Sequence, residues 1–249
     1  MMDARRLPSR FDRYTTKPIP SRTTDVEAAR HTAILECCEP MVRSDQLIRH
    51  EPRYFEAGLP GTSSACWVRE GILSALLQAN KLLAPDLELV TFDGWRSLEC
   101  QATIFDSFRK EIRADNPTLS EEEILQKTSV FASPPRWDPT CPPFHSTGAA
   151  IDMTLAWKNG PLLDLGTDFD DLTDLAGTAA FEGSDHPARL SRRLLFWLLD
   201  QLGFENLSQE WWHFDRFGQL WAFQRPGTIC RYGIVDDPIS LEPESAIAS

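Results

Sequence analysis

Three stretches of the chain carry apolar residues at the three- to four-residue spacing of a helix with one buried face. The first spans residues 68–83 and is closed by Ala84-Pro85, the second follows the sequence DGWRS, and the third spans Arg189 to Leu202. The third stretch is expected to end at Gly203, because glycine commonly occupies the position just after a helix. The apolar positions of the first two stretches are Val68, Ile72, Leu76, Ala79 and Leu83, and then Ala102, Phe105 and Phe108.

Two shorter helices are also expected. Residues 25–39 carry a brief apolar pattern among charged neighbours. Residues 116–127 include Ser120, followed three residues later by Glu123, which is the pattern of a capping box at a helix N-terminus. Residues 40–66 are rich in Pro, Gly and Ser, so this segment is expected to be irregular.

Apolar runs between turn residues predict the strands. The run LELVTF lies between Pro85 and Asp93-Gly94 and indicates a buried strand, and a second strand is expected over residues 149–157. Two further short strands are expected on either side of Arg216 to Gly218. Because these strands are few and irregularly spaced, the pattern favours an α+β fold with a small, largely antiparallel sheet flanked by helices, not a doubly wound sheet.

The chain shows no internal repeat and no linker that would divide it, so a single domain is expected over residues 25–238. Residues 1–24 are basic and punctuated by proline, which suggests a flexible lead-in. Residues 239–249 are expected to form a loose tail.

The composition excludes several classes of protein. Hydrophobic residues make up 42% of the chain and eight are tryptophans, so a sizeable core can form and global disorder is excluded. The formal net charge of −12 argues against nucleic acid or an anionic membrane surface as the main partner, because both require clustered Lys and Arg. Nothing in the pattern indicates a protein partner.

The distribution of apolar residues and cysteines bears on the compartment. No apolar run approaches the roughly 20 residues of a membrane span, and the N-terminus lacks the apolar core of a secretory signal. A cytoplasmic protein is therefore expected. The six cysteines are scattered without a CxxC pair, which favours free thiols over a disulfide framework or a cysteine-rich zinc site.

The strongest candidates for metal-ligating residues lie in the stretch FHSTGAAID. It places His145 and Asp152 seven residues apart, with a turn at Gly148 that lets both side chains point to one place. The five prolines between Ser133 and Phe144 exclude regular structure on the approach to His145. Imidazole and carboxylate groups are common zinc ligands, and a third ligand is needed. The best candidate lies downstream in the sequence QEWWHFD, which would complete a His-Asp-His set.

Two charged residues could serve chemistry at such a centre. Glu210 lies three residues before His213 and could accept a proton from a metal-activated water and pass it to a leaving amine. Arg96, just after the expected buried strand, could hold a positive charge beside an oxyanion or a substrate carboxylate. Taken singly, a histidine that follows two tryptophans is more often a buried core residue than a ligand. The remaining histidines, His31, His50 and His186, lie in polar surroundings and are expected at the surface.

Taken together and in order, DGWR, HSTGAAID and EWWH resemble the motifs of the zinc D-alanyl-D-alanine dipeptidases. These belong to the zinc DD-peptidases, whose fold is shared with Hedgehog signalling domains. The resemblance covers about residues 50 to 215. It implies an enzyme that holds one zinc ion per chain and cleaves a small dipeptide.

The resemblance also implies roles for individual residues. His145, Asp152 and His213 would hold the zinc ion, Glu210 would act as general base and then general acid, and Arg96 would stabilise the tetrahedral intermediate. The sequence GTDFD places Asp170 where the family has an aspartate that contacts the free amino group of the substrate. This favours a dipeptidase, although Asp170 could equally be one more solvated carboxylate in an acidic loop.

Two positions depart from the family pattern, and three alternatives stay open. Ser97 stands where the family often has proline, and Pro143 stands where it often has serine near the substrate, so the exact dipeptide is in doubt. The chain could be a D,D-carboxypeptidase acting on longer cell-wall peptides, or a zinc-fold binding protein without turnover. A thiol hydrolase using Cys141 with His145, four residues away, is disfavoured, because prolines lie between them and no positive helix terminus is there to activate the thiol.

Overall fold

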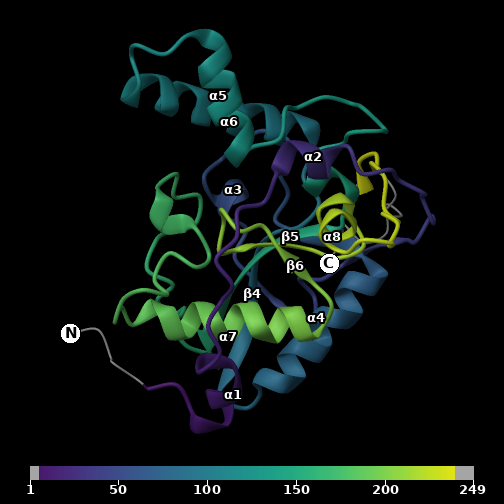
Figure 1. The fold of residues 1–249 in the computed structure, drawn as a ribbon. Coiled ribbons are helices and arrows are strands. Elements are labelled where there is room, and N and C mark those ends of the chain that lie inside the picture. Colours follow the sequence, from purple (N-terminus) through teal and green to yellow (C-terminus); the bar gives the residue numbers. More distant parts are fainter. Residues whose placement is uncertain (1–5, 239–249) are drawn as a thin grey trace.

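A five-stranded sheet forms the centre of the protein (Figure 1), as seen in the computed structural model, which describes residues 6–238. The strands lie in the order β2-β4-β5-β7-β6. β2 runs parallel to β4, and every other neighbouring pair is antiparallel. The prediction of an α+β fold with a largely antiparallel sheet is confirmed. The strand bounds are β2 Arg49–His50, β4 Leu87–Asp93, β5 Ala150–Trp157, β6 Glu205–Asn206 and β7 His213–Asp215.

Two long helices cover one face of this sheet, and two others project away from its far side (Figure 1). The covering helices are α4, Glu70–Leu83, and α7, Ala188–Gln201. The projecting pair is α5, Leu98–Asp115, and α6, Glu121–Phe131. The shorter helical elements are η1 Ser9–Phe11, α1 Asp12–Thr15, α2 Val26–Arg30, α3 Arg53–Glu56, η2 Phe144–Thr147, η3 Asp174–Ala176 and α8 Gln219–Gln224.

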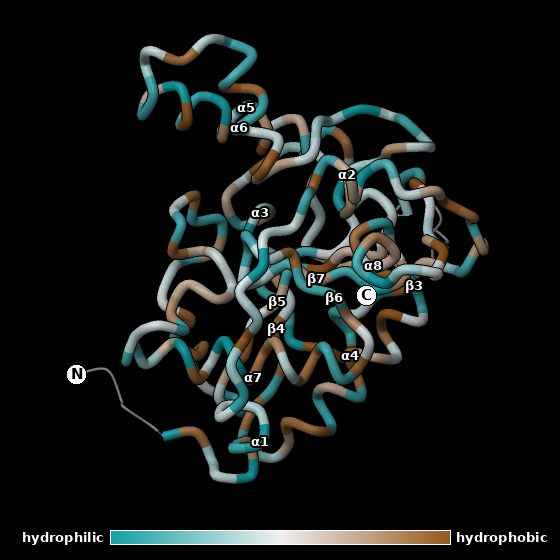
Figure 2. The backbone as a smooth tube through the Cα atoms, in the orientation of Figure 1, coloured by the Kyte–Doolittle hydropathy of each residue, from teal (hydrophilic) through white to brown (hydrophobic). Residues whose placement is uncertain are grey.

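The main core lies between the sheet and the covering helices, and Figure 2 shows hydrophobic residues along α4, β4 and β5. Successive side chains of a strand point to opposite faces of the sheet. In β5, Ile151, Met153 and Leu155 therefore join the core, while Asp152 faces away from it. This alternation leaves the other face of β5 free for polar groups.

The long elements agree with the sequence-based predictions. β4 and β5 form as expected, α4 and α7 end close to the predicted residues, and Gly203 has a positive φ of 83° after α7. Ser120 and Glu123 make both halves of the predicted capping box at the start of α6. Residues 40–66 are mostly irregular but contain α3, β2 and the short strand β1, Met41–Arg43, which pairs with β3, Trp67–Arg69.

Two predictions near the chain ends are wrong in detail. The helix expected over residues 25–39 covers only α2, after which Ile34 forms an isolated bridge with Cys230. Both strands expected around residues 216–218 lie before that turn, as β6 and β7, and the segment after Gly218 is the helix α8. A six-residue run that contains Leu220 and Ala222 is too short for its apolar pattern to distinguish a helix from a strand.

The N-terminal segment also differs from the flexible lead-in that was expected. Residues Ser9–Thr15 pack against α7, with Phe11 and Tyr14 buried in the main core, and the Tyr14 hydroxyl donates to Gln201 Oε1 at 3.1 Å. Arg193 Nη1 and Trp197 Nε1 also donate to the carbonyl oxygens of Thr15 and Lys17, so apolar burial and polar contacts together hold a segment whose composition suggested mobility. The predicted loose tail, residues 239–249, lies outside the described residues. Among residues 6–238, every helix is too short or too polar to cross a bilayer.

Candidate metal centre and its cavity

Asp152 and His213 lie directly opposite each other on neighbouring strands. In the antiparallel pairing of β5 with β7, Asp152 is in register with His213 and Ile151 is in register with Phe214. Opposed residues point to the same face of a sheet, so the buried pair Ile151 and Phe214 turns Asp152 and His213 to the other face. The apolar alternation of two strands thus brings two of the predicted ligands together.

His145 reaches the same place from η2, the turn that precedes β5. The chain reverses at Gly148, which has a φ of 71° and whose Cβ, if present, would lie 2.6 Å from the Met41 side chain. A side chain there would be both strained and obstructed. The Nδ1 atom of His145 lies 2.8 Å from the Gly94 carbonyl oxygen. Because a carbonyl oxygen only accepts, Nδ1 carries the proton, and the Nε2 lone pair of the neutral ring is left free.

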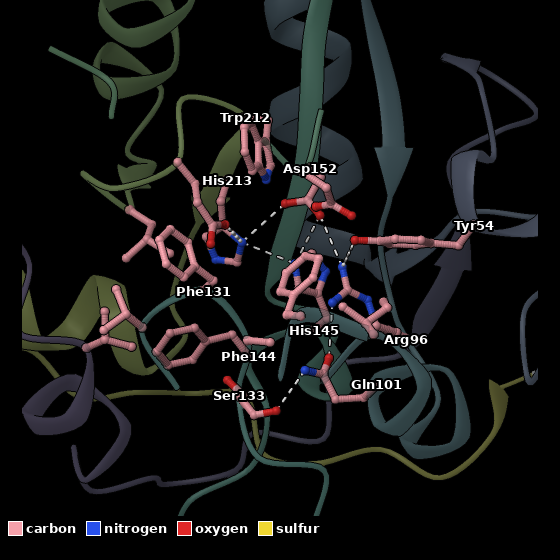
Figure 3. A pocket seen from close by; sticks show the side chains of 18 of the residues that line it. Tyr54, Arg96, Gln101, Phe131, Ser133, Phe144, His145, Asp152, Trp212 and His213 are labelled. Atoms are coloured by element: carbon pink, nitrogen blue, oxygen red, sulfur yellow. Dashed lines mark hydrogen bonds and ion pairs between the residues drawn. The ribbon is translucent and has the colours of Figure 1, made fainter. Parts of the chain in front are cut away.

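The three predicted ligands converge on one point, as Figure 3 shows. His145 Nε2 lies 3.1 Å from His213 Nδ1 and 3.3 Å from Asp152 Oδ2, and His213 Nδ1 lies 3.2 Å from Asp152 Oδ1. All three side chains are buried. Two imidazole nitrogens and a carboxylate oxygen within 4.8 Å of one another form a candidate metal site.

The chemistry of this donor set fits a divalent cation. His145 directs a lone pair toward a carboxylate, which is unfavourable without a cation between them. Asp152 Oδ1 is a buried atom that accepts no hydrogen bond from residues 6–238. Two histidines and one carboxylate are a ligand set used by catalytic zinc sites, which keep a further position open. The residues present therefore fit a zinc ion.

The protonation of the other two groups suits metal binding. Burial alone would raise the pKa of Asp152, but the neighbouring His145 and His213 rings outweigh it and hold that pKa well below its usual range. Burial lowers the pKa of His213. Asp152 is therefore ionised and His213 neutral near pH 7, which are the forms that bind a metal.

Arg96 anchors the carboxylate of Asp152. Its Nε donates to Asp93 Oδ2 at 2.7 Å, its Nη1 to Gln101 Oε1 at 3.1 Å, and its Nη2 to Asp152 Oδ2 at 3.2 Å and to the Tyr54 hydroxyl at 3.3 Å. Asp93 and Asp152 are in register on β4 and β5, so the guanidinium also offsets the repulsion between two adjacent carboxylates. The supporting groups Asp93, Gln101 and Tyr54 were not predicted from the sequence, although Asp93 opens the DGWR motif.

Glu210 lies beside the three ligands, with its Oε2 3.8 Å from His213 Nδ1. The Asn206 side-chain amide donates to the carbonyl oxygens of Glu210 and His213, each at 3.0 Å, and so holds the intervening turn. Burial, followed by the charges of Asp152 and Asp170, raises the pKa of Glu210 well above its ordinary value. Burial and the neighbouring carboxylates thus favour the protonated form of Glu210.

Asp170 lines the same cavity from the loop that follows β5. Its φ of 61° lies in the left-handed region, where residues other than glycine are uncommon, and such strain often marks a functional position. Burial raises the pKa of Asp170 to about 7, against the opposing effects of Arg96 and of a hydrogen bond with Tyr54. Asp170 is therefore a half-buried residue of the cavity wall and not a fully solvated surface carboxylate.

The cavity has an empty volume of about 450 Å³ and two contrasting ends (Figure 3). The polar end holds the three ligands together with Arg96, Glu210, Asp170 and Tyr54. The rest of the wall is largely apolar, and Figure 3 shows Phe131 and Phe144 beside His213. A pocket with one polar end and a largely apolar wall suits a small polar molecule.

The other histidines and Cys141 are not part of this cluster. His31 and His186 are exposed as expected, while His50 is half-buried and its Nδ1 lies 2.9 Å from the Thr91 carbonyl oxygen. The two ring nitrogens of His145 face Gly94 and the other predicted ligands, so its nitrogens are engaged by groups other than the Cys141 thiol. This geometry disfavours a cysteine–histidine hydrolase.

Comparison with known proteins gives one consistent result. A family model described as Peptidase M15, D-Ala-D-Ala dipeptidase, matches residues 62–231. The chain is 30% identical over 217 residues to the D-alanyl-D-alanine dipeptidase of Synechocystis, covering 77% of this chain and 87% of that protein. It is 27% identical over 152 residues to the Escherichia coli protein of the same name, covering 60% of this chain and 66% of the relative. For the Enterococcus faecium protein the identity is 29% over 152 residues, with 57% and 69% covered.

The matched region contains every residue of the candidate centre from Arg96 to His213 and the three motifs noted in the sequence. It covers well over half of the chain, and the three ligands lie together within it. On these grounds the chain belongs to the D-Ala-D-Ala dipeptidase family of metallopeptidases, Peptidase M15, and is an enzyme.

Proposed function

We propose that this enzyme is a zinc-dependent dipeptidase that hydrolyses D-alanyl-D-alanine or a closely related short D-amino-acid dipeptide. The observation that carries the proposal is the buried convergence of two histidines and one aspartate at the polar end of a small cavity, with Glu210 beside them. The similarity to proteins named D-alanyl-D-alanine dipeptidase supports the substrate class.

In the proposed mechanism, His145, Asp152 and His213 hold one zinc ion per chain. Bound there, zinc would polarise the substrate carbonyl and lower the pKa of an attacking water. Arg96 fixes the orientation of Asp152 through its 3.2 Å hydrogen bond. Its fixed positive charge also stabilises the negative charge that develops on the carbonyl oxygen of the tetrahedral intermediate.

Glu210 moves the protons. Its raised pKa lets the carboxylate take a proton from the attacking water and then give it to the nitrogen of the leaving amino acid. The same group can do both, because the carboxylate that accepts the proton becomes the acid that returns it. The apolar side chains of Phe131 and Phe144 line the same cavity and lower its local polarity, which strengthens each of these charge interactions.

Asp170 is proposed to bind the free amino group of the substrate, which predicts a specific kinetic change. Asp170→Asn is expected to raise KM for D-Ala-D-Ala roughly 10- to 100-fold, because a charge-assisted hydrogen bond is lost. The KM for N-acetyl-D-Ala-D-Ala, which has no cationic amine, should change little in this variant.

The KM of the wild type should depend on pH. The charged carboxylate of Asp170 disappears as the pH falls through a pKa of about 7, so KM should rise toward acid pH. A bound dication lowers that pKa, which moves the rise to a lower pH. Asp170→Asn should not show this pH dependence. If the substitution raised KM equally for D-Ala-D-Ala and N-acetyl-D-Ala-D-Ala, Asp170 would not be the group that binds the substrate amine.

The proposed function is tested by zinc analysis and an amine-release assay on purified protein. The expected result is about one zinc per chain and rapid hydrolysis of D-Ala-D-Ala. Faster cleavage of a longer peptide that ends in D-Ala-D-Ala would favour a D,D-carboxypeptidase. Zinc binding without turnover of D- or L-dipeptides would favour a binding protein that retains the zinc fold.

A further inference from the structure

Two buried arginines, Arg30 and Arg96, line the cavity. They differ in whether every guanidinium nitrogen donates a hydrogen bond to the protein. Each of the three nitrogens of Arg96 donates to a side chain. Arg30 is also buried, at 3% exposure, yet its Nε makes no hydrogen bond with any residue between 6 and 238. One guanidinium is therefore committed to the protein, and the other retains a free donor.

The surroundings of Arg30 fix it at the cavity wall. It is the last residue of α2, and its backbone carbonyl accepts a 2.6 Å hydrogen bond from Gln219 Nε2 of α8. Its Nη2 donates to the Ser129 carbonyl oxygen of α6 at 2.7 Å. The guanidinium carbon lies 5.9 Å from the centroid of the Phe144 ring, and that ring lies 6.0 Å from the ring of His213. Arg30 is thus separated from a candidate metal ligand by one aromatic side chain.

The positive charge of Arg30 is poorly compensated. Its ion-pair partner is Glu27, at 3.4 Å, but the Glu27 side chain is 69% exposed and lies on the solvent side. Glu210 also attracts Arg30 electrostatically, but the two side chains do not form an ion pair within 4 Å. Burial lowers the pKa of Arg30, as expected for a desolvated cation. A buried charge with an unused donor is unfavourable in the free protein, and a bound anion would relieve it.

We propose that Arg30 binds the C-terminal carboxylate of the substrate and makes a free carboxylate a requirement for binding. A dipeptide carries one positive and one negative group, and the cavity offers Asp170 for the amine and Arg30 for the carboxylate. This assignment rests on the proposed dipeptidase function. Arg30 does not act on the reacting atoms, so it determines specificity and takes no part in the chemical step.

The test compares D-Ala-D-Ala with D-alanyl-D-alanine amide, which lacks the negative charge. The wild type is expected to favour the acid over the amide by roughly 10- to 100-fold in kcat/KM, the size of one charge-assisted interaction. In Arg30→Met, KM for the acid should rise by that factor while kcat is retained, because the interaction is the same in ground and transition states. The acid and the amide should then be hydrolysed almost equally well. Arg30→Lys, which keeps the charge but loses the paired donors, should retain part of the preference.

A structural role for Arg30 would give a different result. Arg30 also ties α2 to Ser129 of α6, so its loss could simply disturb the fold. In that case Arg30→Met would weaken acid and amide equally, and the proposal would be overturned. Glu27→Gln removes the partner carboxylate and leaves the guanidinium in place, and it should keep the full preference for the acid. Zinc content and melting temperature of each variant show whether the fold is intact.

Binding measurements separate this inference from the proposed function. Calorimetric titration of D-Ala-D-Ala and its amide into Glu210→Gln protein, in which hydrolysis is expected to be slowed by roughly 10²- to 10⁴-fold, reports the same preference from binding. Suppose that the wild type hydrolyses no dipeptide and still binds the acid more tightly than the amide, with Arg30→Met abolishing that preference. The proposed function would then be wrong, and the carboxylate site at Arg30 would stand. If the wild type hydrolyses D-Ala-D-Ala but binds the acid and the amide equally, the carboxylate site at Arg30 is wrong and the dipeptidase function stands.

Discussion

Replacement of Glu210 by glutamine is expected to lower kcat for dipeptide hydrolysis by roughly 10²- to 10⁴-fold, the usual contribution of a general acid–base group. Glutamine has nearly the same shape as glutamate but cannot accept the proton of the attacking water. Glu210 lies 3.8 Å from His213 and is not one of the three converging ligands, so the variant should keep its zinc. Steady-state kinetics and elemental analysis on the same preparation measure both quantities.

The control for this variant is Asp168→Asn. Asp168 is an exposed carboxylate two residues from Asp170, so its neutralisation changes the net charge near the cavity without touching the polar end. It should retain the wild-type kcat. Glu210→Gln protein with a wild-type rate would exclude Glu210 as the proton carrier, and loss of zinc from it would instead make Glu210 a fourth ligand.

The candidate ligands could be predicted from the sequence because each lies in a short, distinctive motif. The sequence DGWR ends a buried strand, and HSTGAAID supplies both a turn and a strand, so local pattern and chemistry coincide. What brings the motifs together is not local. The register of Asp152 with His213 depends on β7 entering between β5 and β6, and strands as short as β6 and β7 carry too little periodicity to predict their pairing.

The groups that support the site were missed for a similar reason. Tyr54 contacts Arg96 across 42 residues of sequence, and its segment resembles an irregular loop. Arg30 lies in a helix of five residues, so its apolar pattern gave no sign that the side chain lines a cavity. Buried polar residues of this kind are fixed by tertiary contacts. Because polar residues are usually exposed, the sequence alone does not identify the few that are buried.

Replacement of Asp152 by alanine is expected to abolish both zinc binding and turnover, the largest effect of any single change proposed. Asp152 contacts both histidines and Arg96, so its loss removes a ligand and leaves the Arg96 guanidinium without one of its two carboxylate partners. Chelation of zinc from the wild type should abolish activity in the same way, with recovery when zinc is returned. Elemental analysis and thermal unfolding with and without added zinc check this result, since a ligand at 1,000 times its Kd adds about 4 kcal/mol to the free energy of unfolding.

Asp93→Asn distinguishes a ligand from its support. Asp93 is in register with Asp152 on β4 and holds Arg96 and, at 3.6 Å, the Nδ1 side of His145, but it is not among the converging ligands. Groups that orient ligands typically contribute 10- to 100-fold to metal affinity, so this variant should bind zinc more weakly and recover activity when zinc is added in excess. Asp152→Ala should not recover at any zinc concentration. If Asp152→Ala retained one zinc per chain, or if both variants recovered alike, the metal would be held by a different set of residues and the assignment of His145, Asp152 and His213 would fall.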